Sequence, residues 1–158
     1  MKIGLKAALI GAVFSASAAC VSGVQPVHPN LGLQPLATRN VAAEEAVRAF
    51  ANAYNEGDLD AMLAVAARDI VWLDVKGENV TVAANGADNL RAVMSDYVNA
   101  SAPPRSAVAI LTSHGRFVTT LERAYYAVDG KETSQAAFAV YELNADKIRR
   151  VWYYPAEK

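Results

Sequence analysis

The chain has 158 residues, about the length of one domain, and 53% of them are hydrophobic, so a packed core is expected and wholesale disorder is not. The formal net charge of −1 argues against a nucleic-acid partner, because binding phosphates needs a patch of Lys and Arg. One cysteine and two histidines exclude a disulfide framework and a Cys/His zinc cluster, so no metal site is predicted.

The first 20 residues have the pattern of a secretory signal peptide. A basic start is followed by an apolar run over 7–14 and by small residues over 15–19, just before Cys20. These small residues resemble a bacterial lipobox, in which Cys20 is lipidated, although Ser17 stands where leucine is usual. Residues 16–18 fit an ordinary cleavage site equally well. We therefore predict an exported protein, periplasmic or anchored to the membrane as a lipoprotein, with Cys20 as the lipidation site and no other membrane contact.

Residues 21–40 are predicted to form a tether. This stretch holds three of the six prolines, a single charge and no apolar periodicity. His28 lies here beside Pro29, which argues against a catalytic or ligand role for it. The folded domain is expected to span 41–158.

Apolar spacing predicts three helices and one strand in the first part of this domain. The helices are expected over 41–56, about 59–67 and 86–97, with Gly57 ending the first and Asp58 capping the second. A strand is expected over 70–74, followed by a loop or short strand through Thr81 and Val82.

After Pro104 the pattern changes to antiparallel strands joined by tight turns at His114–Gly115, Asp129–Gly130 and 144–146. The expected strands cover 107–113, 117–128, 133–143 and 148–154. Helices followed by a meander predict an α+β fold. Such long strands twist, and helices on one face would cover it only in part, so a cone with a concave ligand site is expected.

Phe50 to Asp60 (FANAYNEGDLD) and Asp69 to Asp74 (DIVWLD) resemble the nuclear transport factor 2-like superfamily, most closely its SnoaL-like (polyketide cyclase) and ketosteroid isomerase branches. The helix after Gly86 and the closing segment 147–155 fit the same pattern, so the resemblance covers about residues 42–155. It implies a cone-shaped fold with three N-terminal helices packed on a curved antiparallel sheet. This fold hosts both enzymes and binding proteins, so the resemblance specifies fold more than function.

Asp74 is the candidate catalytic residue. The resemblance aligns it with the proton-shuttling carboxylate of ketosteroid isomerase. By the two-residue period of a strand it shares a face with Trp72, and a carboxylate beside an indole is partly removed from water, which suits a general base. The alternative is a carboxylate that caps the end of the strand or pairs with Lys76.

The other catalytic groups of the two related enzyme branches do not carry over. The isomerase polarises its ketone with a tyrosine and a protonated aspartic acid, and these positions fall on Phe50 and near Ala139. The limonene-epoxide hydrolase branch uses two aspartates that flank an arginine. Arg123 matches the arginine, but Tyr125 and Tyr153 stand at the aspartate positions.

Two registers of the predicted strand 117–128 stay open, and a slip of one residue exchanges its faces. The isomerase alignment turns Glu122, Tyr126, Gln135 and Tyr153 into the cavity, and the hydrolase alignment turns Arg123 and Tyr125 inward instead. A surface ion pair between Glu122 and Arg123 is the other interpretation of that pair. The candidate ligand-binding residues are Phe50, Tyr54, Trp72, Met94, Tyr97, Glu122, Tyr126, Gln135 and Tyr153.

Two functions are compatible with these features. The first is an exported domain that binds a small, largely apolar ligand in its cone. The second is an isomerase- or cyclase-like enzyme that uses Asp74 to move a proton on a cyclic or carbonyl substrate. Neither requires a cofactor, since the sequence has no Gly-rich phosphate loop. A homodimer is expected through the outer face of the sheet, and a purely structural role within such a dimer is a third alternative.

Overall fold

The computed structural model of the protein describes residues 38–156. The predicted signal peptide, the lipidation site Cys20 and all but the last three residues of the predicted tether lie outside the described residues. Within this part of the chain, none of the helices has the length and apolar character that spanning a bilayer requires.

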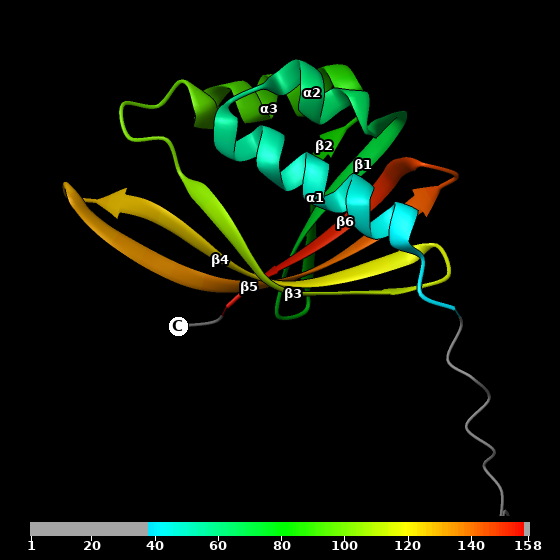
Figure 1. The fold of residues 1–158 in the computed structure, drawn as a ribbon. Helices are drawn as coiled ribbons and strands as arrows, with labels where there is room; N and C mark the ends of the chain where they lie inside the picture. Colours follow the sequence, from blue (N-terminus) through cyan, green and yellow to red (C-terminus); the bar gives the residue numbers. More distant parts are fainter. Residues whose placement is uncertain (1–37, 157–158) are drawn as a thin grey trace, which may run out of the picture. The chain divides into compact units, whose positions relative to one another are not determined.

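Three helices and six strands make up the described domain (Figure 1). In chain order they are α1 (Val41–Glu56), α2 (Leu59–Ala64), β1 (Ala66–Lys76), β2 (Asn79–Asn85), α3 (Ala87–Val98), β3 (Arg105–His114), β4 (Phe117–Val128), β5 (Lys131–Asn144) and β6 (Lys147–Pro155). The number of helices and the α+β fold class agree with the prediction.

Local signals in the sequence fix the ends of the first two helices. The side chain of Asn40 accepts a hydrogen bond from the Ala43 amide at 3.1 Å and so caps α1. Gly57 ends this helix in the left-handed conformation, with φ of 71°, and Asp58 then caps α2. Helix α2 stops at Ala64, earlier than predicted, because the chain from Ala66 onward is already paired with β6.

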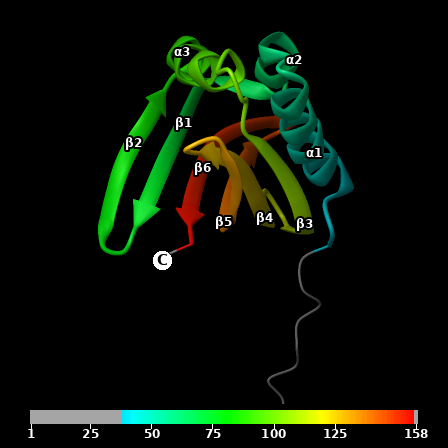
Figure 2. The same cartoon turned by 90° about the vertical axis from the view of Figure 1, so that its left-hand side faces the viewer.

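The strands form one sheet in the order β2-β1-β6-β5-β4-β3. Every neighbouring pair is antiparallel except β1 and β6, which run parallel, so the sheet is mixed. Figure 2 shows the strands arranged in an arc, with α1 against β3 and α3 against β1 and β2. The expected curved sheet is confirmed, and the parallel pair is an addition to the predicted antiparallel meander.

The register of β4 follows the isomerase alignment. Val118, Thr120 and Glu122 are buried on the face toward the helices, whereas Leu121 and Arg123 are exposed on the opposite face. This alternation is the two-residue period of a strand with one covered face.

The hydrophobic core lies between the helices and the covered face of the sheet. Its largest fully buried side chains come from α1, α2, α3 and four of the strands. They are Val47, Met62, Ile70, Leu90, Val118, Thr120, Leu143, Ile148 and Val151.

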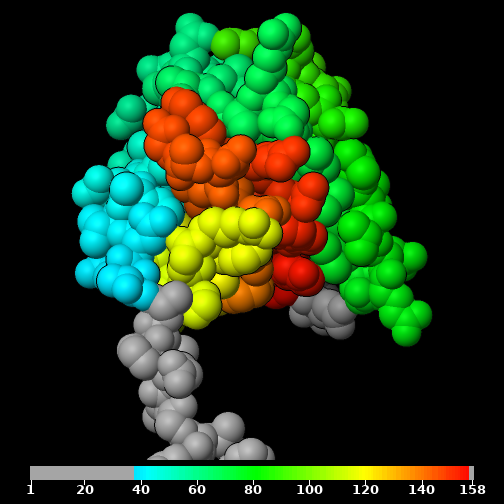
Figure 3. Space-filling model, turned by 90° about the vertical axis from the view of Figure 1, so that its right-hand side faces the viewer, coloured from blue at the N-terminus to red at the C-terminus, as the bar shows by residue number. Residues whose placement is uncertain are grey.

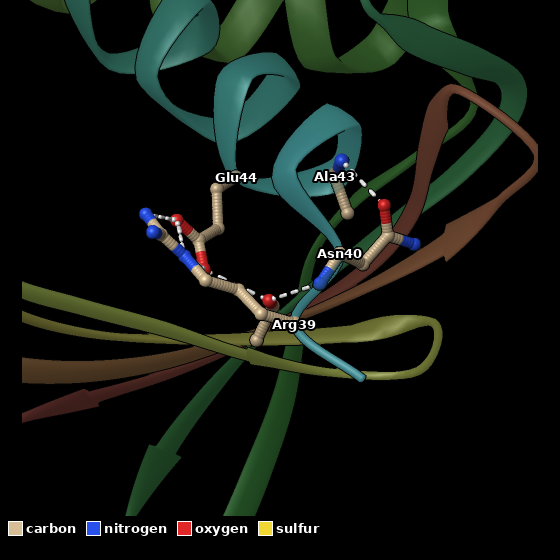
Figure 4. A network of polar contacts seen from close by, with 5 residues as sticks. Arg39, Asn40, Ala43 and Glu44 are labelled. Carbon is tan, nitrogen blue, oxygen red and sulfur yellow. Dashed lines mark hydrogen bonds and ion pairs between the residues drawn. The ribbon is translucent and has the colours of Figure 1, made fainter. Parts of the chain in front are cut away.

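A polar network attaches the start of α1 to the β3–β4 turn (Figure 4). The guanidinium of Arg39 and the hydroxyl of Ser113 both donate to the buried carboxylate of Glu44, at 2.6 and 2.8 Å. The backbone amide of Asn40 donates to the Ser113 hydroxyl, and the Asn40 side chain donates to the Gly115 carbonyl. The same turn (yellow) lies beside the start of α1 (cyan) in Figure 3. Bonding to Arg39 lowers the pKa of Glu44 to about 2.

Candidate functional site

A cavity of about 830 Å³ opens between the helices and the concave face of the sheet. Asp74 lines it, and so does every residue predicted to bind a ligand. These residues are Phe50, Tyr54, Trp72, Met94, Tyr97, Glu122, Tyr126, Gln135 and Tyr153. The structure therefore brings the predicted site together in one place, while the roles of these residues stay predictions.

Four aromatic rings follow one another along the wall of the cavity. The Phe50 and Trp72 rings stack with centroids 6.1 Å apart, and Trp72 lies 5.8 Å from Tyr153. At the other end of the row, the Tyr141 ring packs edge-on against Phe50, with the ring centroids 6.4 Å apart. Because Phe50 comes from α1 and the other rings come from β1, β5 and β6, the row also joins the helix to the sheet.

Asp74 is half-buried on β1, next to Trp72 on the same face of the strand. The Trp72 indole nitrogen donates a hydrogen bond to its carboxylate at 3.2 Å. No cationic side chain among residues 38–156 lies within ion-pair distance of Asp74, so the predicted alternative of a pair with Lys76 does not form there. Its carboxylate is available to the cavity.

Glu122 is the second carboxylate of the cavity, and only 5% of its surface is exposed. Three hydroxyls donate to it: Thr120 at 2.6 Å, Tyr141 at 2.9 Å and Ser106 at 3.0 Å. The arrangement spans β3, β4 and β5 and satisfies a buried carboxylate with neutral donors alone.

Sequence reasoning included Glu122 but missed the hydroxyls around it. The only local signal was the two-residue spacing from Thr120, because Ser106 and Tyr141 come from neighbouring strands whose register was unknown. The predicted surface ion pair with Arg123 does not form. Arg123 is on the outer face and donates to the Ser134 hydroxyl at 3.2 Å.

Tyrosine hydroxyls complete the polar part of the cavity. Burial, followed by the nearby charge of Glu122, raises the pKa of Tyr153 well above its ordinary value. Burial likewise raises the pKa of Tyr54 to about 12. Both side chains therefore stay protonated at neutral pH and can donate hydrogen bonds to a ligand.

The remaining predicted residues form the outer part of the site. The Tyr126 hydroxyl donates to the side-chain carbonyl of Gln135 at 3.3 Å, and the Gln135 amide donates to the Ala156 carbonyl. Tyr97 is 50% exposed at the end of α3, whereas Met94 is buried one turn earlier.

The catalytic groups of the isomerase and epoxide hydrolase branches are not found at the corresponding positions of this chain. Phe50 lines the cavity as a buried hydrocarbon ring, and Ala139 is fully buried, so neither supplies a hydrogen-bond donor. Tyr125 follows Arg123 on the outer face, where its ring packs under the Arg105 guanidinium at 4.3 Å. His114 is exposed at the end of β3, away from the cavity lining. Over the described residues, no cluster of three His, Cys, Asp or Glu side chains has the geometry to hold a metal ion.

Solved structures of other proteins share this fold. An LEH-like epoxide hydrolase of M. tuberculosis matches 73% of this chain and 84% of its own, with 19% identity and a TM-score of 0.63. A candidate polyketide cyclase of Xanthomonas campestris matches 72% of this chain and 90% of its own, with 21% identity and a TM-score of 0.60. A Catenulispora acidiphila protein with a ketosteroid isomerase-like fold, solved in complex with trimethylamine, matches 70% and 84% of the two chains, with 14% identity and a TM-score of 0.60.

The search of curated proteins finds no match. A family model does match the sequence itself: residues 47–151 fit the SnoaL-like domain, and this range includes α1 from Val47, the remaining helices and most of the sheet. The match covers well over half of the chain and contains every cavity residue singled out above except Tyr153, which lies just beyond it. The chain therefore belongs to the SnoaL-like domain family.

Proposed function

We propose that this SnoaL-like domain binds a small, largely apolar molecule in its cone. The observation that carries the proposal is the cavity of about 830 Å³, which has the size of a small-molecule site and is lined by aromatic and aliphatic side chains with a few polar groups. Its volume is open and is not filled by the protein's own rings, which argues against a purely structural role. The trimethylamine complex of one neighbour of the same fold is in keeping with a small-molecule site here.

A thermal-stabilisation screen with steroids, lactones and polyketide-like ketones tests this proposal. A ligand that binds only the folded protein raises its melting temperature. Ala124→Leu projects a larger side chain into the cavity and should abolish each stabilisation. Ala136→Leu, on the neighbouring strand and the opposite face, should leave it intact. Stabilisation that survives Ala124→Leu contradicts binding in the cone.

The alternative is an acid–base enzyme in which Asp74 moves a proton on a cyclic or carbonyl substrate. It is supported by a carboxylate that reaches the cavity with one hydrogen bond from Trp72, and by the Tyr54 and Tyr153 hydroxyls in the same cavity. Any hit from the screen that is also turned over should lose its turnover in Asp74→Asn, which keeps the shape and removes the base. Turnover that persists in this variant excludes Asp74 as the proton carrier.

Export and lipidation at Cys20 belong to the same proposal and are supported by the leader pattern of residues 1–20. A lipid anchor would place the cavity near a membrane surface, where apolar ligands concentrate. Mass spectrometry of membrane fractions tests this: a mature chain that starts at an acylated Cys20 supports the anchor, and an unmodified chain that starts at Ala19 eliminates it.

We also propose a homodimer through the outer face of the sheet. Ile110, Leu121, Phe138 and Tyr154 form one continuous row across β3, β4, β5 and β6, each paired with the next, and each between 38% and 56% exposed. An apolar row of this kind on a curved sheet suits pairing with a second copy of itself.

A further inference from the structure

Two carboxylates share the cavity, and they come from opposite parts of its wall. Asp74 stands on β1 and Glu122 on β4, and two strands separate β1 from β4 in the sheet. Both negative charges contribute to the raised pKa of Tyr153, so both act on the same phenol group. A ligand in this cavity meets negative charge on two sides.

Neither carboxylate has a cationic partner within the described part of the chain. The seven ion pairs found over residues 38–156 all involve other acids. Glu122 is buried against hydroxyls alone, and Asp74 has the Trp72 indole. Glu122 is buried to a degree at which acidic side chains are usually paired with a positive charge, and Asp74 is half-buried.

The two basic residues that border the cavity form no ion pair with either carboxylate. Arg105 lies opposite Tyr125, so its side chain belongs to the outer face, where it pairs with Glu132 at 3.0 Å and lies over the Tyr125 ring. Lys76 shares the Asp74 face of β1 and borders the cavity, but it is exposed at the last position of the strand, before the turn into β2. The interior of the cavity therefore combines two negative groups with a wall of aromatic rings.

Aromatic faces carry partial negative charge and attract cations, most strongly quaternary or protonated amines. The cavity wall provides such rings next to Asp74: Trp72, which bonds to its carboxylate, and Tyr153, which is paired with Asp74 on the neighbouring strand. A neutral apolar ligand would instead displace water from Asp74 without replacing its hydrogen bonds, and desolvating an unpaired carboxylate is strongly unfavourable. A ligand with a positive charge removes this penalty.

We propose that the ligand of this cavity is an organic cation, a protonated or quaternary amine on a compact hydrocarbon body. The amine is held between the carboxylates of Asp74 and Glu122 and against the aromatic rings beside Asp74, and the hydrocarbon body fills the apolar part of the cavity. This inference rests on the proposed function, since it names the chemical class of the molecule that the cone binds.

Adamantylamine and adamantanol provide a matched test, because they share one rigid hydrocarbon cage and differ in charge at neutral pH. Binding of each to the full-length protein is measured by isothermal titration calorimetry. The amine should bind at least about tenfold more tightly, the size of a single partly desolvated charge or cation–π contact. Asp74→Asn and Glu122→Gln should each reduce this preference, and circular dichroism checks that both variants stay folded. If Glu122→Gln does not fold, Asp74→Asn, a change at a half-buried position, carries the test alone.

The outcomes separate this inference from the proposed function. Equal affinity for the two compounds, or tighter binding of adamantanol, overturns the cationic ligand and leaves a cavity that binds apolar molecules. A preference for the amine that is unchanged in Asp74→Asn also overturns it, since the charge would then be recognised elsewhere. Failure of both compounds to bind, together with a screen that finds no ligand, contradicts the proposed function itself.

Discussion

At the scale of single residues, the environment of Glu122 sets the chemistry of the cavity. A buried carboxylate without a cation needs donors for its lone pairs, and the chain supplies them from Ser106, Thr120 and Tyr141 on three different strands. Tyr141 is itself buried, and its pKa is raised well above its ordinary value by burial and by the charge of Glu122. Its hydroxyl therefore remains a donor throughout the neutral range.

Removing one of these donors should destabilise the fold. Tyr141→Phe keeps the ring against Phe50 but leaves Glu122 with one donor fewer, which should cost about 1–3 kcal/mol of unfolding free energy. Urea-induced unfolding followed by tryptophan fluorescence measures the change. Tyr154→Phe is the matched control, because Tyr154 is on the outer face and its ring contacts Phe138; we expect a change within about 0.5 kcal/mol. Equal stability of the two variants would show that the Tyr141 hydroxyl contributes nothing.

The sequence predicted residue positions well where they follow from the short repeat of a strand or a helix. Trp72 and Asp74 share a face because they are two apart on a strand, and Met94 and Tyr97 lie on the same helix one turn apart. The hydroxyl network around Glu122 depended on how three strands align. That alignment is set by the packing of the whole sheet, and a single sequence does not contain it.

At the scale of elements, α1 is attached to the sheet through Glu44, and this contact makes part of the stability depend on pH. Glu44 has a pKa of about 2 in the folded protein, against an ordinary value of 4.5. The unfolded chain therefore binds a proton more readily between these values, so the stabilisation is complete above about pH 5 and is lost as the pH falls toward 2.

Glu44→Gln should remove this contribution. We expect a loss of about 1.5–3 kcal/mol at neutral pH, the range for hydrogen bonds to a charged group, and a shallower fall in stability between pH 5 and pH 2. Denaturant midpoints measured across this range provide the test. Glu45→Gln, at the next and exposed position of α1, should keep the slope of the original protein. An identical acid slope for Glu44→Gln would mean that other carboxylates account for it.

The connection from β2 into α3 requires a glycine. Gly86 has φ of 87° and ψ of 156°, a region of backbone space open almost only to glycine, and its amide donates to the Ile70 carbonyl at 2.7 Å. Gly86→Ala should therefore cost about 1–3 kcal/mol through backbone strain. Gly115→Ala, in the left-handed region with open space around it, should cost only about 1 kcal/mol. Chemical denaturation ranks the two, and the reverse order would refute this account.

The order of elements was predictable from the sequence, whereas the pairing of β1 within the sheet was not. Alternation and turn residues placed the bounds of β3, β4, β5 and β6 within two residues of those observed. The parallel pairing of β1 with β6 joins segments about 80 residues apart, so no hairpin turn in the sequence indicates this pairing. It also explains why β1 begins as early as Ala66, where helical periodicity had suggested that α2 continues.

At the scale of the whole molecule, the sheet has two faces with different uses. The concave face holds the cavity and the core, and the outer face carries the row from Ile110 to Tyr154. Arg123 and the ion pair of Arg150 with Glu142 lie on this outer face, so it bears charges of both signs around its apolar row. Mixed charge around an apolar centre is compatible with a two-fold contact, in which each residue meets the partner's copy of the same surface.

Leu121→Lys tests the proposed dimer. Leu121 lies within the apolar row, between Ile110 and Phe138, and a two-fold contact would bury two new charges for one substitution. The dissociation constant of the dimer should rise at least about tenfold, since burying an unpaired ammonium is costly. Sedimentation velocity across a concentration series measures this change in the dissociation constant.

Val80→Lys, at an exposed position on β2 away from the row, should keep the dimer. A single monomer species for the original protein at high concentration would refute the dimer. Unchanged assembly in Leu121→Lys would place the contact on another face and leave the apolar row without an assigned partner.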